Sequence, residues 1–97
     1  MYTIEKDIEQ QAFNKLKVQK INTSENLDIL SISLEKGAVF PEHTSPREAY
    51  LIMLEGKIKF HIKNEVYNIS QHQHLNFEKE VPHWIEASEN SKFLIVR

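Results

Sequence analysis

The sequence contains no cysteine, and that absence alone excludes several kinds of chemistry. A chain without thiols has no disulfide framework, no thiolate zinc site and no cysteine nucleophile. It also has only two glycines and three prolines, so asparagine, serine, aspartate and lysine must occupy many of its turns. No apolar run approaches the roughly 20 residues that a membrane-spanning helix needs.

The charge balance argues against large anionic partners. The formal net charge is -2 over 97 residues, and the lysines are spread along the chain. This gives no electrostatic case for binding nucleic acid or a membrane surface. The first eleven residues are polar and acidic, unlike a signal or transit peptide. Together with a length that suits one domain, this predicts a soluble cytoplasmic protein.

Short stretches of alternating apolar and polar residues run through most of the chain. The alternation is cleanest in Lys57–Lys63, and residues 63–65 read as a hairpin turn. Val39, Pro41 and His43 alternate with their neighbours on another short extended piece. About eight or more such strands, with turns at roughly 8–12-residue spacing, predict an all-β sandwich or barrel.

Two segments depart from this simple pattern. The first dozen residues have apolar positions at four-residue spacing, which predicts a short N-terminal helix capped by Thr3. Residues 49–54 are apolar on both faces, which predicts a strand covered on both sides. The core would cover one face, and either the N-terminal segment or a second copy of the chain would cover the other.

Two groups of residues resemble the sequence motifs of one family. Gly37, His43 and the pair Glu55-Gly56 resemble the first motif of the cupins, and Val81-Pro82-His83 resembles the second. The stretch between the motifs is short, as in small single-domain cupins. The resemblance implies a jelly-roll β-barrel of antiparallel strands, with residues 1–97 as one cupin domain. Residues 1–26 would form an N-terminal segment and residues 27–97 the barrel with both motifs.

The resemblance also implies where a metal ion would bind. In metal-binding cupins, two histidines and a glutamate of the first motif join one histidine of the second. In this sequence His43 takes the first position and His83 the last. Ser45 takes the place of the second histidine and Ala49 that of the glutamate. Two of the four usual ligands are therefore present for one divalent ion of iron, zinc, manganese or nickel.

A metal site would need a third ligand, because catalytic zinc commonly has three protein ligands and non-haem iron has two histidines and one carboxylate. Glu48 lies one residue from the glutamate position. Alternation turns its side chain to the other face, unless a bulge after Pro46 reverses this. His74 is the second candidate, on a strand face shared with Asn76. The alternative is that His43 and His83 are hydrogen-bonded inside a cavity without metal.

Three hypotheses about function follow from these residues. The first, which we prefer, is a module that binds a small molecule or a weakly held metal in the barrel mouth without turnover. The second is a metal-dependent enzyme of the dioxygenase or isomerase type that uses His43 and His83. The third is a non-catalytic structural or regulatory homodimer. The fold alone does not choose among them, because one scaffold hosts many activities.

Overall fold

The computed structural model describes residues 1–97, which consist mainly of antiparallel strands that follow one short helix. In chain order the elements are α1 (Asp7–Gln10), β1 (Leu16–Thr23), β2 (Asp28–Leu34), β3 (Val39–His43), β4 (Ala49–Glu55), β5 (Lys57–Ile62), β6 (Glu65–Ser70), β7 (His74–Phe77), β8 (His83–Ala87) and β9 (Ser91–Val96). The predicted all-β jelly roll of antiparallel strands is confirmed. The helix is too short to cross a membrane.

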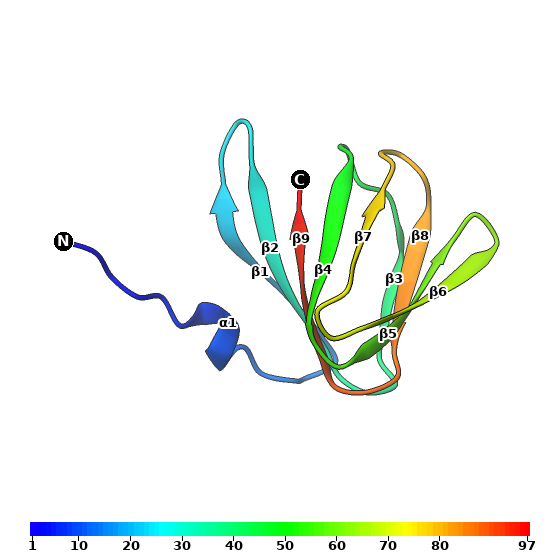
Figure 1. The fold of residues 1–97 in the computed structure, drawn as a ribbon, viewed down its shortest axis with the longest axis horizontal. Helices are drawn as coiled ribbons and strands as arrows, with labels where there is room; N and C mark the ends of the chain where they lie inside the picture. Colours follow the sequence, from blue (N-terminus) through cyan, green and yellow to red (C-terminus); the bar gives the residue numbers. More distant parts are fainter.

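The strands form two sheets that face each other (Figure 1). The larger sheet has the order β1-β2-β9-β4-β7, and the smaller has the order β3-β8-β5-β6. The most C-terminal strand, β9, therefore lies in the middle of the larger sheet, paired on both sides. The two sheets are hydrogen-bonded separately, so they form a sandwich-like jelly roll and not a continuously bonded barrel.

The core fills the space between the sheets with side chains from alternate strand positions. On β5, Ile58 and Phe60 are buried whereas Lys57 and Lys59 are exposed, as the alternation predicts. The buried apolar side chains are Leu30, Ile32, Leu34, Ala49, Leu51, Met53, Ile58, Phe60, Ile69, Phe77, Ile85, Ala87, Phe93 and Ile95. Burial of these apolar side chains is the main force that holds the two sheets together.

The N-terminal helix is shorter than the sequence predicted. It covers four residues, and its N-cap is Lys6, which makes no side-chain capping bond, so the predicted Thr3 cap is wrong. One helical turn has little stability of its own, because it pays the entropy of nucleation for very few hydrogen bonds. Packing against the larger sheet must therefore hold the segment in place.

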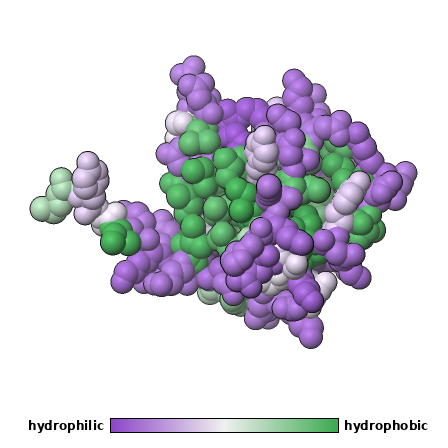
Figure 2. All heavy atoms as spheres, in the orientation of Figure 1, coloured by the Kyte–Doolittle hydropathy of each residue, from purple (hydrophilic) through white to green (hydrophobic).

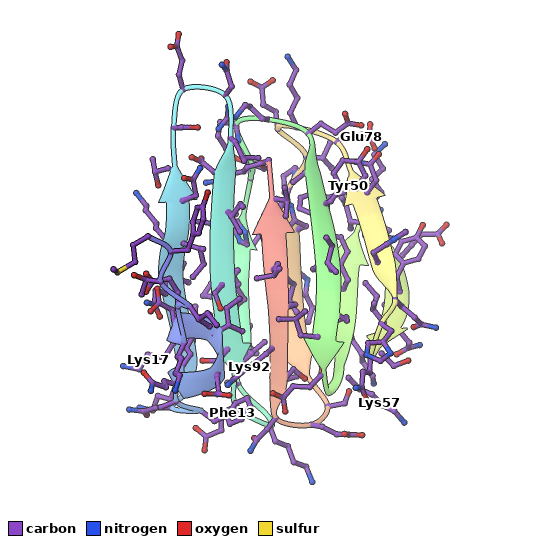
Figure 3. The ribbon with its side chains drawn as sticks, turned by 60° about the vertical axis from the view of Figure 1, so that its left-hand side comes forward. Phe13, Lys17, Tyr50, Lys57, Glu78 and Lys92 are labelled. Carbon is purple, nitrogen blue, oxygen red and sulfur yellow. The ribbon has the colours of Figure 1, made fainter.

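Two buried polar side chains attach this segment to the sheet. The amide of Gln11 donates to the carbonyl oxygen of Ser31 at 3.0 Å and accepts from the Ser31 hydroxyl at 2.6 Å. The ammonium group of Lys92, on β9, donates to the carbonyl oxygens of Ile8 and Glu9 at 2.8 and 3.2 Å. Lys92 thus gives the Glu9 carbonyl a donor and adds a second one to the Ile8 carbonyl, which also accepts from the Gln11 N–H at 3.3 Å. Figure 3 shows α1 lying over β1 and β2, close to Lys92.

The same outer face of the larger sheet is bare at its other end. Tyr50 lies there, away from α1 (Figure 3), and is 50% exposed, whereas its neighbours Ala49 and Leu51 are fully buried. Apolar side chains gather over β2, β9 and β4 in Figure 2. We call this patch the outer apolar face; cross-strand pairing brings together its residues Ile29, Tyr50, Ile52, Leu94 and Val96. The N-terminal segment therefore does not provide the predicted second cover of β4.

Candidate ligand pocket at the open end of the fold

At the end of the sandwich where the C-terminus lies (Figure 1), a bulge aims a histidine of β3 inward. The β3–β8 ladder pairs Phe40 with Ile85 and then His43 with His83, so β3 advances by one residue more than β8. Such a bulge moves the following side chain to the other face. His43 therefore shares the inner face with Phe40, and the predicted simple alternation along Val39–His43 is wrong.

Backbone carbonyls orient both imidazoles. The Nδ1 atom of His43 lies 2.7 Å from the carbonyl oxygen of Pro41, and that of His83 lies 2.9 Å from the carbonyl oxygen of Val81. A carbonyl oxygen only accepts, so each Nδ1 carries a hydrogen and donates it. The two Nε2 atoms face each other at 3.1 Å. With both backbone bonds made, the lone pairs of the two Nε2 atoms face each other, and a hydrogen or a metal ion between these atoms would relieve their repulsion.

His83 is the more deeply placed ring. It is 2% exposed and lies against the rings of Phe60 and Phe77, with centroids 5.3 and 4.7 Å away. Burial holds the pKa of the His83 imidazole below its usual value, the hydrogen bond to Val81 opposes this shift, and the nearby His43 adds to it. These causes disfavour a pair in which both rings are protonated.

The structure does not bring either candidate third ligand to this pair. Glu48 is exposed, next to the fully buried Ala49. His74 is also exposed and pairs with Ile52 across the outer face of the larger sheet. No three histidine, aspartate or glutamate side chains in the chain are grouped so that they could hold a metal ion. Ser45, in the place of the second motif histidine, is buried at 2% exposure.

The histidine pair has some features of a metal site but not its ligand count. Two imidazoles about 2.0–2.1 Å from one ion lie roughly 3 Å apart when they are adjacent in its coordination sphere. The Nε2–Nε2 distance of 3.1 Å is close to that value, and Nδ1 bonds to carbonyls are common behind metal ligands. Zinc enzymes and non-haem iron enzymes need at least one more protein ligand. The residues present therefore do not complete either kind of site.

A recess of about 230 Å³ opens beside the pair; we call it the mouth pocket. It is smaller than the roughly 300–1,000 Å³ of pockets that hold drug-sized ligands. Its lining consists of apolar residues of both sheets and the β3–β4 loop and of five polar residues: Leu30, Ile32, Phe40, Pro46, Phe77, Ile85 and Ile95, with His43, Thr44, Ser45, His83 and Arg97. No aspartate or glutamate lines it. The walls of the mouth pocket are thus mainly apolar, and its polar side chains are two imidazoles, one guanidinium and two hydroxyls.

Arg97 brings a guanidinium to the mouth pocket. Its backbone pairs with that of Asp28 through hydrogen bonds of 3.0 and 2.6 Å, which extend the β2–β9 ladder by one residue. Its Nε atom is buried without a hydrogen-bond partner, 3.5 Å from the Asp28 carboxylate. That carboxylate lies closer to Arg47, at 3.1 Å. Two guanidinium groups therefore share one carboxylate, and the ion pair of Arg97 with Asp28 is the longer of the two.

A wider recess of about 520 Å³ lies beside the β5–β6 turn, on the outer face of the smaller sheet. There the ring of His61 stacks on Trp84 at 3.6 Å, and its Nε2 lies 2.8 Å from a carboxylate oxygen of Glu86. The imidazole of His61 is thus stacked and hydrogen-bonded, whereas the guanidinium of Arg97 lacks a strong partner. The chemistry therefore favours the mouth pocket as the ligand site, despite its smaller volume.

Sequence reasoning selected neither Arg97 nor Asp28. A signal was present, because Phe93, Ile95 and Arg97 occupy alternate positions and therefore share the inner face of one strand. Arg97 follows β9 and Asp28 begins β2, so the two paired residues lie far apart in the sequence. No local pattern reveals such a contact.

Comparisons with known proteins support the fold. The model of the cupin domain family matches residues 30–96. An RmlC-like cupin from Desulfovibrio desulfuricans is 22% identical with a TM-score of 0.86, over 99% of this chain and 95% of that one. A conserved protein of unknown function from Streptococcus pyogenes is 27% identical with a TM-score of 0.77, over 84% and 72% of the two chains. An RmlC-like cupin from Methanocaldococcus jannaschii is 22% identical with a TM-score of 0.81, over 100% and 87%. No curated protein matches the chain.

Proposed function

This chain belongs to the cupin domain family, and from that premise we propose that it is a binding module that holds a small organic molecule in the mouth pocket without turning it over. The observation that carries the proposal is the recess of about 230 Å³ with apolar walls and converging polar groups. Binding sites for small molecules have this composition, in which apolar walls supply affinity and a few polar groups fix orientation.

The polar groups favour binding over catalysis. The hydroxyl of Ser45 donates to the carbonyl oxygen of Arg47 at 2.5 Å, so it is not directed at His43 as an activated nucleophile would be. The imidazoles of His43 and His83 are bonded to each other and to backbone carbonyls. None of these groups is arranged as a general base beside a nucleophile.

Ligand-detected NMR with a library of small organic molecules tests the proposal. Filling the mouth pocket by Ser45→Leu should abolish the signals of bound molecules, because Ser45 lines the pocket and is 2% exposed. The control Ser24→Leu makes the same change in an exposed turn and should leave binding unchanged. Molecules that bind both variants equally would place the site elsewhere, and no binding to the wild-type chain would end the proposal.

A second candidate, a weakly held divalent ion, is favoured by the separation of 3.1 Å between the Nε2 atoms of His43 and His83. Such an ion would lie between the lone pairs of the two Nε2 atoms, and a metal-dependent activity would follow only with further ligands from water or substrate. Elemental analysis after incubation with Fe²⁺, Zn²⁺, Mn²⁺ or Ni²⁺ decides this point. About one equivalent of metal, lost in His83→Ala, supports it, and no retained metal leaves the first proposal alone.

We also propose that two copies of the chain pair through the outer apolar face. Its support is the half-exposed ring of Tyr50 among other apolar side chains, at a place that the N-terminal segment leaves bare (Figure 3). Exposed apolar patches on small domains commonly mark interaction surfaces, and a second copy is the simplest cover. Such pairing would leave the mouth pocket open, because the patch lies on the outside of the larger sheet.

A further inference from the structure

The guanidinium of Arg97 has too few partners for its place in the mouth pocket. An arginine side chain carries five N–H donors. Here the hydrogen bond found for this group runs from Nη1 to the Ser45 hydroxyl at a long 3.4 Å. Its Nε is buried and unpartnered. Buried donors are normally satisfied, so a guanidinium with an unpartnered Nε and a side chain 21% exposed at the mouth pocket can accommodate a further acceptor there.

The charges around this group point to an anionic acceptor. The only carboxylate that contacts Arg97 is that of Asp28, at 3.5 Å, and the same carboxylate makes a shorter contact of 3.1 Å with Arg47. The lining of the mouth pocket contributes no further acidic side chain. The guanidinium groups of Arg47 and Arg97 therefore share a single carboxylate. An anion that enters the pocket meets attraction there and no opposing carboxylate on the walls.

The apolar walls of the mouth pocket indicate that the anion also has an apolar part. Isoleucines 32, 85 and 95 and the rings of Phe40 and Phe77 line the same space. An inorganic anion would leave these surfaces in contact with water, whereas an organic acid would cover them. The volume of about 230 Å³ limits its body to a short chain or a single ring.

We propose that the mouth pocket takes a small organic carboxylate, whose two oxygens bind the guanidinium of Arg97 while its apolar body packs against the isoleucine and phenylalanine walls. The planar guanidinium binds a carboxylate with two parallel charge-assisted hydrogen bonds, which a neutral amide cannot match. The same fork also fits inorganic phosphate, so the apolar walls are what favour an organic acid over that ion. The inference rests on the proposed function and narrows it, because it specifies the class of small molecule that the module binds.

The first test compares acids with their amides on the unmodified chain. Propionate, hexanoate and benzoate are each titrated beside propionamide, hexanamide and benzamide at constant ionic strength. Methyl NMR signals of Ile32, Ile85 and Ile95 report the mouth pocket, and that of Ile69 reports a part of the core away from it. We expect at least one acid to bind ten- to a hundredfold more tightly than its amide. Inorganic phosphate should leave the pocket methyl signals unshifted.

The second test removes or strengthens the charge. Arg97→Gln should weaken binding of that acid by ten- to a hundredfold and leave binding of the amide unaffected. The affinity of Arg97→Lys for the acid should lie between those of the wild type and Arg97→Gln, because lysine keeps the charge but cannot make two parallel hydrogen bonds to a carboxylate. Asp28→Asn removes the competing carboxylate and should tighten binding. Lys17→Gln removes the same charge from an exposed position on β1 and should change nothing.

The outcomes separate the inference from the proposed function. Acids and amides that bind the pocket equally well, or binding by neutral molecules alone, would overturn the carboxylate assignment and leave the binding module standing. Acid binding that survives Arg97→Gln and Arg97→Lys undiminished would overturn it as well. If no molecule of any class shifts the pocket methyl signals, the proposed function itself fails. The acid–amide comparison uses the wild-type chain, so it decides the question even if an Arg97 variant does not fold.

Discussion

Replacing Gly56 by alanine should destabilise the fold far more than the same change at Gly37. Both glycines have positive φ, +88° and +84°, a conformation that costs a residue with a side chain about 1–3 kcal/mol. Their surroundings differ. An added Cβ at Gly37 meets no atom within 4 Å. At Gly56 it would lie 2.7 Å from the Cα of Ser91, and even closer to the Ser91 hydroxyl and the carbonyl oxygen of Asn90.

The magnitude follows from what must move. The Ser91 hydroxyl that the new methyl group would displace accepts from the Lys57 N–H at 3.1 Å, and its single hydrogen is within reach of the carbonyl oxygens of Glu89 at 2.8 Å and Lys57 at 3.0 Å. Each lost hydrogen bond costs about 0.5–1.5 kcal/mol, and forcing backbone apart adds about 1–3 kcal/mol. We therefore expect Gly37→Ala to cost about 1–3 kcal/mol and Gly56→Ala about 2–6 kcal/mol more, out of a total of about 5–15 kcal/mol for such domains.

Urea unfolding followed by the fluorescence of Trp84, the only tryptophan, measures both values. The comparison isolates the steric contribution, because the two variants share the backbone penalty and the lost flexibility of the unfolded chain. Equal losses of unfolding free energy in the two variants would refute the steric reasoning and leave the positive φ as the whole cause. A larger loss at Gly37 would refute the structure of the β4–β5 turn itself.

Three further predictions concern the histidine pair, the N-terminal segment and the outer apolar face. Burial lowers the pKa of His83 below 6.5, so the folded state favours the neutral ring. The free energy of unfolding should therefore fall as the pH drops from 6.5 toward the lowered pKa. Urea titrations of His83→Gln should show a smaller fall over the same pH range. Lys92→Met removes the two hydrogen bonds from the ammonium to Ile8 and Glu9, and should speed limited proteolysis before residue 13, whereas Lys17→Met, on an exposed side chain, should not. Ile52→Glu, which places a charge in the outer apolar face, should shift light-scattering mass from two chains to one at micromolar concentration; a wild-type chain that is already monomeric there would contradict the proposed pairing.

Much of the fold could be predicted because its strands are half-buried. The alternation of Lys57–Lys63 matches β5, and the expected hairpin turn lies where Lys63 and Asn64 both adopt positive φ, as the type I′ turn of a two-residue hairpin loop requires. The N-terminal helix was predicted too long, because four-residue spacing alone does not show how few contacts a segment has. Gln11, the residue that attaches it to the sheet, is polar and did not enter a pattern built on apolar positions.

The candidate site was predicted less completely than the fold. The two motif positions led to His43 and His83, and the structure brings their Nε2 atoms within 3.1 Å; whether they bind a metal stays a prediction. The side chain of His43 points inward because of a β-bulge between Phe40 and His43, and no residue type in this segment predicts that bulge. The sequence did not single out Arg97 and Asp28, because what distinguishes them is how few hydrogen bonds and ion pairs the Arg97 guanidinium makes. Only the folded structure shows these contacts.

The central position of β9 in the larger sheet has a consequence for the synthesis of the protein. Residues 91–96 leave the ribosome after all the other strands, yet β2 and β4 both form their ladders with them. Until then these two strands expose unpaired edges, which are templates for association with other chains. The larger sheet can therefore form completely only after β9 has been synthesised. We expect the nascent chain to depend on chaperones, or on rapid completion of synthesis, more than a protein whose early strands pair with one another.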